Sequence, residues 1–400
     1  MELLKKNHSA IEQVMSLTPG GMHDGRDNIL KLLGILGNPQ DSLSVFHVTG
    51  SNGKGSVCQM IAQVLSKQFH KKVGLFTSPH LIDITERFQI HWKPISSSQL
   101  NTYYKKTLGL AKKYAIELSF FEIQVVAMVL YFTDEKVEYA VVETGLWGLY
   151  DGTNIFDHPL ACFITSVTIE HAHVLGKTRT SIQRNKLGIV KKWTTLYTHL
   201  ANKHILEYCQ RIWAHLASIT KHSLPLTNLP GKHQQKNALL VFQALYDLWF
   251  DAQEIRTGLQ KIYNPGRFEW LSPHLLVDTA NNEENITLLK NMMGKDLSKA
   301  TLIFGTTQVD PLYAAKLIHM FPGHKKILVD GFCERALPCS EYSHLVQCDT
   351  VWHLDTPKWR EALLDVIEDI GNTQKYLLFW SIYLVGYTMI LSRHNIFAKG

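Results

Sequence analysis

The chain has 400 residues, and 45% of them are hydrophobic, which is enough apolar surface to build the cores of two domains. This composition excludes disorder as the main state. The net charge is only +6, and the Lys and Arg residues form no run longer than a pair, so no nucleic-acid surface is indicated.

The six cysteines form no C-x-x-C pair, so neither a structural zinc site nor a disulfide framework is indicated. The N-terminus lacks the apolar stretch of a secretion signal, and the apolar stretches over 125–132 and 376–386 are shorter than the ~20 residues that cross a bilayer. We therefore expect a monomeric protein of the cytoplasm whose partners are small molecules, with no nucleic acid and no membrane among them.

The first half of the chain alternates short apolar stretches with segments of helical periodicity. Strands are predicted over 43–48, 72–76, 139–143 and 161–167, and helices over 56–69, 97–115 and 120–135. Such alternation predicts a mostly parallel sheet with helices on both faces.

The pattern restarts after Lys192. Helices are predicted over 202–216, 234–250 and 357–370, and strands over 275–278, 300–304, 326–329 and 376–380. Asn264-Pro265-Gly266 is the best candidate for a linker, because Pro and Gly interrupt regular structure there. We therefore predict two domains, residues 1–264 and 265–400.

The sharpest local signal is the sequence TGSNGKGS over 49–56, between a predicted strand and a predicted helix. Glycines let the backbone wrap around phosphate, the helix N-terminus favours anions, and Lys54 can reach the β and γ oxygens of a nucleotide. The segment departs from G-x-x-x-x-G-K-[ST] because Gly55 stands between the lysine and the serine. Nucleotide binding is favoured over a glycine turn without a ligand.

Three more polar segments follow predicted strands, where ligands bind in open α/β sheets. They are 77–81 with 86–88, then 143–154, then 165–171. Their hydroxyl, carboxylate and imidazole groups are possible ligands for the Mg²⁺ that accompanies ATP. Taken alone, Glu143 could instead be a helix-capping partner and His171 a surface residue.

These motifs, in their order along the chain, resemble those of the folylpolyglutamate synthase and dihydrofolate synthase branch of the Mur ligases. The matching segments are GSNGKGS, SPHL with ERF, ETGLWGLYDGTN, ITSVTIEH, RNKLGI, GKHQ with Asn237, PGR at 265–267, DTANN at 278–282 and YLVG at 383–386. The resemblance implies an α/β fold of Mur ligase architecture. Its N-terminal part would be a P-loop-containing ATPase domain with a mostly parallel sheet that also seats a pterin. Its smaller C-terminal part would be a Rossmann-like α/β glutamate-ligase domain.

The activity implied by the resemblance is ATP-dependent addition of L-glutamate to dihydropteroate, to the γ-carboxylate of folates, or to both, through an acyl phosphate. ATP and two Mg²⁺ ions would be required, with K⁺ as a further option. Two alternatives stay open: a Mur-type ligase with another carboxylate substrate, and a nucleotide-binding relative whose catalysis is reduced.

The resemblance also assigns roles to individual residues. ATP would be bound by Gly50, Asn52, Gly53, Lys54, Gly55, Ser56, Asn237, Arg267 and Asp278, and Mg²⁺ by Ser78, Glu143 and His171. The acyl substrate would contact Arg26, Ser119, Tyr150, Asp151 and Gly152. The catalytic set would be Lys54, Lys186, His171 and Glu143, with Lys186 matching a lysine that is carbamylated in the family.

The sequence departs from the family pattern at several positions. Trp147 and Leu149 replace a glycine and an arginine beside the expected pterin site, and Thr279, Asn281 and Val309 replace family residues in the second domain. These changes leave the predicted ATP and Mg²⁺ residues intact. They leave open which acyl substrate is used and how the incoming amino acid binds.

Overall fold

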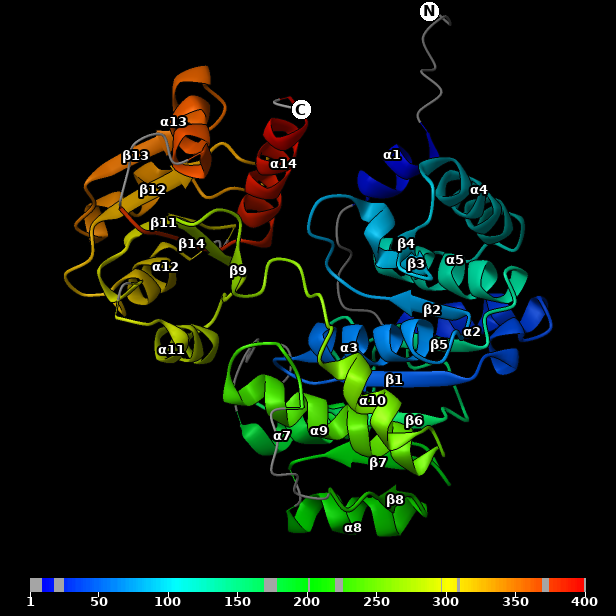
Figure 1. The fold of residues 1–400 in the computed structure, drawn as a ribbon. Coiled ribbons are helices and arrows are strands. Elements are labelled where there is room, and N and C mark those ends of the chain that lie inside the picture. Colours follow the sequence, from blue (N-terminus) through cyan, green and yellow to red (C-terminus); the bar gives the residue numbers. More distant parts are fainter. Residues whose placement is uncertain are drawn as a thin grey trace, which may run out of the picture. The chain divides into compact units, whose positions relative to one another are not determined.

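The computed structural model describes residues 9–17, 25–168, 178–200, 202–219, 226–295, 297–307, 310–368 and 374–398. The chain divides into two compact units (Figure 1). Unit 1 comprises residues 1–80 and 84–263, and unit 2 comprises Leu81–Asp83 and residues 264–400. The chain passes from unit 1 into unit 2 for the last time between Tyr263 and Asn264, directly before the Pro265-Gly266 pair. The short segment Leu81–Asp83 also belongs to unit 2. The sequence prediction did not include this, because it treated residues 1–264 as one continuous domain.

Unit 1 is built on a sheet whose strands are β1 (Val45–Thr49), β2 (Val73–Phe76), β3 (Phe88–Ile90), β4 (Lys93–Pro94), β5 (Tyr139–Glu143), β6 (Ala161–Ile164), β7 (Thr195–Thr198) and β8 (His215–Leu216). Their order is β4-β3-β2-β5-β1-β6-β7-β8. All neighbours from β2 to β8 pair in parallel, whereas β3 and β4 are antiparallel at one edge. Strand β1 lies between β5 and β6 and is buried along its whole length, so the loop that follows it is held by the centre of the sheet.

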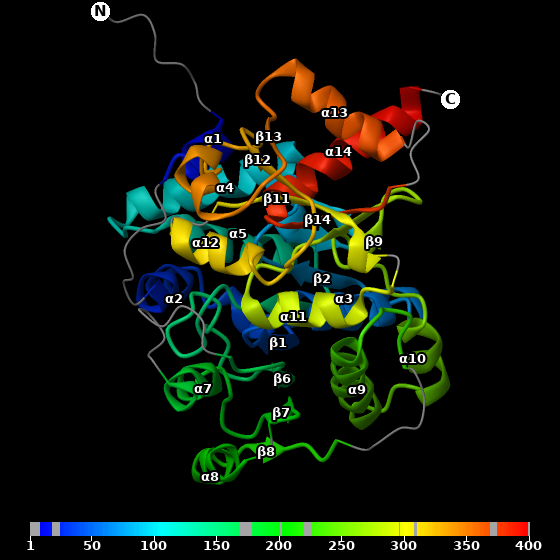
Figure 2. The same ribbon diagram turned by 90° about the vertical axis from the view of Figure 1, so that its left-hand side faces the viewer.

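Helices cover both faces of this sheet (Figures 1 and 2). They are α1 (Ala10–Met15), α2 (Gly25–Ile35), α3 (Lys54–Lys67), α4 (Ser97–Lys113), α5 (Phe120–Asp134), α7 (Arg179–Leu187), α8 (Lys203–Ile212), α9 (Lys232–Asp247) and α10 (Ala252–Leu259). Short 3-10 turns occur at Pro39–Ser42 and Ile84–Arg87.

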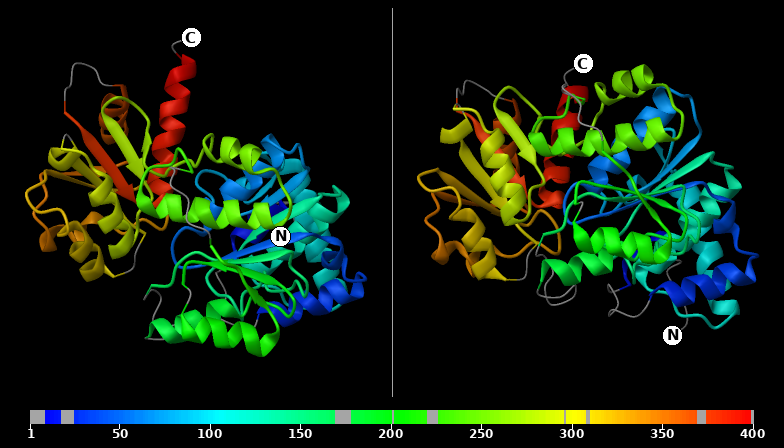
Figure 3. Two further views of the ribbon diagram at one scale, coloured as in Figure 1. Left: turned by 60° about the horizontal axis from the view of Figure 1, so that its bottom comes forward. Right: turned by 90° about the horizontal axis from the view of Figure 1, so that it is seen from below.

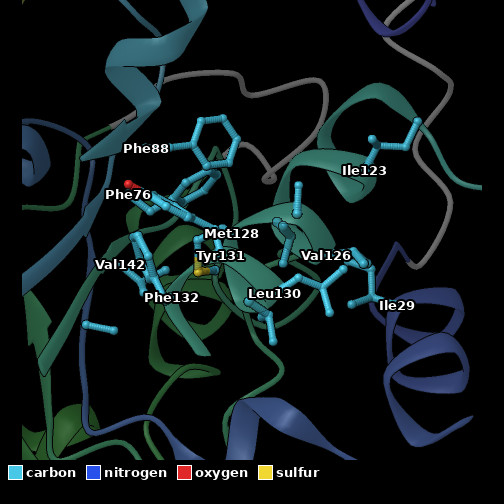
Figure 4. Close-up of a cluster of buried hydrophobic side chains, with 14 of the residues drawn as sticks. Ile29, Phe76, Phe88, Ile123, Val126, Met128, Leu130, Tyr131, Phe132 and Val142 are labelled. Carbon is cyan, nitrogen blue, oxygen red and sulfur yellow. The ribbon is translucent and has the colours of Figure 1, made fainter. Parts of the chain in front are cut away.

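The two faces have separate cores because successive strand residues point to opposite sides. Phe46 and Val48 of β1 pack with α3, α9 and α10, whereas Val45 packs with α2, α4 and α5. Figure 4 shows part of this second cluster, in which side chains of α5 lie between Phe76 and Val142 of the sheet and Ile29 of α2. Helices α7 and α8 cover the strands β6 and β7.

Unit 2 contains a smaller sheet with the strands β9 (Glu269–Trp270), β10 (Leu275–Asp278), β11 (Thr301–Gly305), β12 (Lys326–Asp330), β13 (Thr350–His353) and β14 (Tyr376–Trp380). Its order is β13-β12-β11-β14-β10-β9, and only β9 among these described strands is antiparallel. Its helices are α11 (Glu283–Met292), α12 (Pro311–Ile318), α13 (Pro357–Glu368) and α14 (Ile382–Ala398), with 3-10 turns at Leu297–Lys299, Cys339–Glu341 and Ser343–Leu345. Figure 3 gives further views of these elements.

One core of unit 2 packs α11 and α12 against its sheet, and the other packs α13 and α14. Leu81 and Ile82 join the core of α13 and α14. A Cβ atom on Gly386 of α14 would lie 1.9 Å from the carbonyl oxygen of Leu81, so only glycine allows this approach.

The predicted α/β class with mostly parallel sheets is confirmed. The helix predicted over 202–216 is wrong at its end, because Trp213 adopts a left-handed conformation that terminates α8, and His215–Leu216 then forms β8. In the part of the chain that the structure describes, no helix is long and apolar enough to span a membrane.

Candidate functional site

The predicted phosphate loop connects β1 to α3, and its backbone requires glycine at two positions. Gly50 has φ +151°, and a Cβ atom there would lie 1.9 Å from Oγ1 of Thr165. Gly53 has φ +90° and is the N-cap of α3. The loop therefore folds tightly at the N-terminus of a long helix, which is a favourable position for phosphate.

The residues that follow β6 fix the other side of this loop. Ser166 accepts a hydrogen bond from Ser51 N through its carbonyl oxygen (2.9 Å) and from Asn52 N through its hydroxyl oxygen (2.9 Å). The Thr165 hydroxyl donates to the carbonyl oxygen of Asn52 (2.6 Å). The Lys54 ammonium donates to the carbonyl oxygens of Gly50 (3.0 Å) and Ser51 (3.3 Å), so its charge lies over the loop.

Helix α9 supports the loop from a distant part of the sequence. Gln234 Nε2 donates to the hydroxyl of Ser56 (3.2 Å), and Asn237 Nδ2 donates to Gln234 Oε1 (3.1 Å). Asn237 lies so close to the loop that a Cβ atom on Gly53 would be 3.0 Å from its Nδ2. The structure thus brings the predicted nucleotide residue Asn237 to the phosphate loop.

Glu143 lies beside the same loop, at the end of β5. Its side chain is 5% exposed, and its Oε2 accepts a hydrogen bond from Ser78 N (3.2 Å). A Cβ atom on Gly55 would lie 3.7 Å from that oxygen. A buried carboxylate next to a phosphate loop is the kind of oxygen ligand that Mg²⁺ prefers, so Glu143 fits the predicted metal, and Ser78 is bonded to it through its backbone N–H. His171, the third predicted ligand, lies outside the described residues.

The segment that carries Ser78 is tied to α5 by a buried arginine. Arg87 Nε donates to Nδ1 of His80 (3.0 Å), and Arg87 Nη1 donates to Oε1 of Gln124 (2.9 Å). These bonds connect the SPHL and ERF motifs in space. They give a physical reason why the two motifs occur together.

Lys186 lies on α7 with its side chain fully buried. The neighbouring Asn185 holds the loop after β5: its Oδ1 accepts from Gly148 N (2.8 Å), and its carbonyl oxygen accepts from Leu149 N (2.8 Å). A Cβ atom on Gly148 would lie 2.4 Å from that carbonyl oxygen, so the loop and the helix are in direct contact.

We call residues 145–154 the acceptor loop, because the predicted acyl-substrate residues Tyr150, Asp151 and Gly152 lie in it. Tyr150 is 49% exposed, whereas Asp151 is buried. A Cβ atom on Gly152 would lie 3.3 Å from the ring of Phe121 on α5. The aromatic ring therefore underlies the loop.

The other two predicted substrate residues occupy helix starts. Ser119 is the N-cap of α5, two residues before Phe121, and its hydroxyl accepts from Glu122 N (3.4 Å). Arg26 lies in the first turn of α2, where its Nε is 4.0 Å from Oδ1 of Asp27.

Arg267 and Asp278 lie in unit 2. Asp278 is buried at the end of β10, and its two oxygens accept from Phe268 N (2.8 Å) and Ala280 N (2.7 Å). Burial raises the pKa of Asp278, and the positive charge of Arg267 opposes this shift. One carboxylate oxygen thus holds the backbone just before β9, and the other holds the backbone just after β10.

Two of the residues that depart from the family pattern, Trp147 and Leu149, lie in the acceptor loop. The Trp147 side chain packs on the apolar cluster beneath α7 and α8 and meets the Tyr150 ring edge-on, with ring centroids 6.0 Å apart. Leu149 is exposed. Val309 lies outside the described residues.

A family model and several known proteins are similar to this chain. The family model described as the Mur ligase middle domain matches residues 48–223. The dihydrofolate synthase/folylpolyglutamate synthase of Bacillus subtilis is 29% identical over 337 residues, which cover 73% of this chain and 77% of that protein. The folylpolyglutamate synthase of Lacticaseibacillus casei is 28% identical over 400 residues, which cover 89% of this chain and 91% of that protein.

A solved structure extends the similarity to the whole fold. The bifunctional folylpolyglutamate synthase/dihydrofolate synthase of Yersinia pestis, complexed with AMPPNP and a Mn ion, superimposes with a TM-score of 0.79 at 22% identity. The match covers 96% of this chain and 97% of that one. Fold and phosphate loop together define a Mur ligase. Within that superfamily, the chain is similar over most of its length to the folylpolyglutamate synthase/dihydrofolate synthase family.

Proposed function

We propose that this protein is an ATP-dependent ligase that joins L-glutamate to the carboxylate of dihydropteroate, to the γ-carboxylate of a folate, or to both. The observation that carries the proposal is the phosphate loop with Lys54, directly beside the buried Glu143 carboxylate and Ser78. The B. subtilis and L. casei relatives carry names that describe this chemistry.

The reaction needs ATP because a carboxylate is a poor electrophile. Transfer of the γ-phosphoryl group to a carboxylate oxygen gives an acyl phosphate and ADP. The amine of glutamate then attacks the acyl carbon, and inorganic phosphate leaves with the electron pair of the C–O bond as the amide forms. Phosphoryl transfer of this kind depends mainly on positioning and charge neutralisation, so no side-chain nucleophile is required.

The phosphate loop and Lys54 bind the phosphates of ATP and balance the charge that moves toward ADP. Asn237 packs against Gly53 and supports this part of the site. Ser78 and Glu143, with His171, would hold Mg²⁺, which when bound supplies further positive charge at the phosphates. We also propose a second Mg²⁺, a K⁺ ion and nucleotide contacts by Arg267 and Asp278. These parts of the proposal are supported by the sequence resemblance alone.

Full burial of Lys186 supports the proposal that it is carbamylated. A buried ammonium group is costly, and one beside Mg²⁺ would be repelled, whereas a carbamate carries the charge of a metal ligand. The modification would therefore change Lys186 from a cation into an anion that belongs to the metal site.

The acyl substrate is assigned to unit 1, where Ser119, Arg26 and the acceptor loop would contact it. The second domain, residues 265–400, is proposed to serve glutamate. A monomeric state and a cytoplasmic location stay predictions.

Replacement of Lys54 tests the proposal. Lys54→Ala should lower ADP release that depends on both glutamate and tetrahydrofolate by about 10²-fold or more, because a charge that stabilises the transferred phosphoryl group is lost. The matched control is Lys203→Ala, since the Lys203 side chain is 84% exposed on α8 and should leave the rate unchanged. Wild-type ADP release by Lys54→Ala would contradict the proposal.

A further inference from the structure

His47 is a polar residue in the middle of the buried central strand β1. Its side chain is fully buried, and its neighbours Phe46 and Val48 are core residues. Its Nε2 lies 2.9 Å from Oγ1 of Thr153, which is 106 residues away in the acceptor loop. The proposed chemistry of ATP and glutamate does not use this imidazole.

The direction of the hydrogen bonds follows from the next contact. The Thr153 hydroxyl donates its proton to Oδ1 of Asp151 (2.7 Å), so it must accept from the Nε2–H group of His47. Burial, together with the charge of Lys191, lowers the pKa of His47 to about 3, which keeps the ring neutral at working pH. The imidazole is therefore a fixed neutral donor.

Asp151 uses both carboxylate oxygens to shape the acceptor loop. Besides the Thr153 hydroxyl, Oδ1 accepts from Thr153 N (3.0 Å), and Oδ2 accepts from Trp147 N (3.0 Å). The carboxylate thus ties the two ends of the 147–153 segment together.

The same loop is tied to β1 at a second point. The Thr49 hydroxyl donates to the carbonyl oxygen of Trp147 (3.1 Å) and accepts from the Thr144 hydroxyl (3.0 Å). Thr49 is the last residue of β1 and directly precedes the phosphate loop. The strand that presents the phosphate loop therefore also sets the position of the acceptor loop.

We infer that His47 is a positioning residue of the ligase: acting through Thr153 and Asp151, it holds the acceptor loop against β1 in the conformation that binds the acyl substrate. This inference rests on the proposed function and deepens it. Asp151 then stabilises the conformation of the loop through hydrogen bonds inside it. The contacts with a dihydropteroate or folate acceptor are made by exposed residues of the loop such as Tyr150.

Three variants test the inference by steady-state kinetics with dihydropteroate and with tetrahydrofolate as acceptors. His47→Leu removes the donor but fills the apolar site, and Thr153→Val removes the hydroxyl at nearly constant shape. Each should raise the KM for the acceptor about tenfold, the effect of one lost buried hydrogen bond, and leave the KM for ATP within about twofold. His47→Gln, whose Nε2 can donate in place of the imidazole, should restore a KM close to wild type.

The double variant His47→Leu/Thr153→Val should be no worse than either single variant, because the residues act as one chain. Acceptor KM values that stay at the wild-type level in both single variants, with only the melting temperature lowered, would overturn the inference and leave the ligase assignment standing. A wild-type protein that releases no ADP with either acceptor, and binds neither in the presence of AMPPCP, would overturn the proposed function and the inference with it.

Discussion

Acid should destabilise unit 1 through His47. The pKa of this residue is about 3 in the folded protein, against an ordinary value of 6.5, because burial and Lys191 disfavour the charged ring. Between these two pH values the unfolded chain binds a proton that the folded chain does not. The contribution of His47 is therefore fully present above about pH 6.5 and is lost as the pH falls toward about 3.

The size of the effect follows from linkage. Stability falls by about 1.4 kcal/mol per pH unit within this window, which amounts to about 2 kcal/mol between pH 7 and pH 5. The His47→Gln variant cannot take up this proton, so its stability should fall by about 2 kcal/mol less than that of the wild type between pH 7 and pH 5. All other titrating groups are shared by the two proteins, so their effects cancel in the comparison.

Hydrogen exchange of the β1 amides measures the effect locally, after correction for the intrinsic pH dependence of exchange. On going from pH 7 to pH 5, the opening free energy of β1 should fall by about 2 kcal/mol more in the wild type than in His47→Gln. Equal losses in the two proteins would refute the reasoning, because they would show that His47 takes up its proton as readily in the folded chain as in the unfolded one.

Two further predictions concern buried groups of α3. Gln63 holds the last residue of unit 1 by two hydrogen bonds, from its Nε2 to Tyr263 O (2.6 Å) and from Tyr263 N to its Oε1 (3.0 Å). Gln63→Leu should lower the free energy of unfolding in urea by about 1–3 kcal/mol. The control Gln253→Leu, on the exposed surface of α10, should change it little. Equal effects of the two substitutions would contradict a stabilising role for the Gln63–Tyr263 hydrogen bonds. Burial and the charge of Glu143 raise the pKa of the Cys58 thiol, so Cys58 should resist iodoacetamide in the folded protein, and rapid labelling read by peptide mass would show that this part of α3 is open.

The parts of the site that could be predicted are those whose signal is local in sequence. The tight glycine loop between β1 and α3 could be predicted from its glycines, because a strand, a tight turn and a helix N-terminus impose that pattern within a few residues. The buried strands β5, β10 and β14 were found at their observed bounds because their apolar runs are continuous. The short strands β3, β4, β8 and β9 carry no such run and were missed, and β7 and β13 were missed as well.

The parts that could not be predicted depend on contacts between distant residues. The sequence marks His47 only as one residue of a buried strand, and nothing near it indicates a partner in the acceptor loop. Asp151 was predicted as a substrate ligand, a role that stays untested, while the structure shows its oxygens engaged with Thr153 and Trp147. The sequence likewise gives no sign that Leu81–Asp83 belongs to unit 2, where Leu81 and Ile82 join the core of α13 and α14 and Leu81 approaches Gly386.

The central claim is that this chain activates a folate-type carboxylate with ATP and joins it to glutamate. The most direct test supplies dihydropteroate or tetrahydrofolate with ¹⁸O in the reacting carboxylate, together with ATP, Mg²⁺ and L-glutamate. The account predicts a product extended by one glutamyl residue for each ADP released, with one ¹⁸O atom transferred to inorganic phosphate through the acyl phosphate. Absence of any glutamylated product with either acceptor, or a product whose accompanying phosphate carries no ¹⁸O, would contradict it.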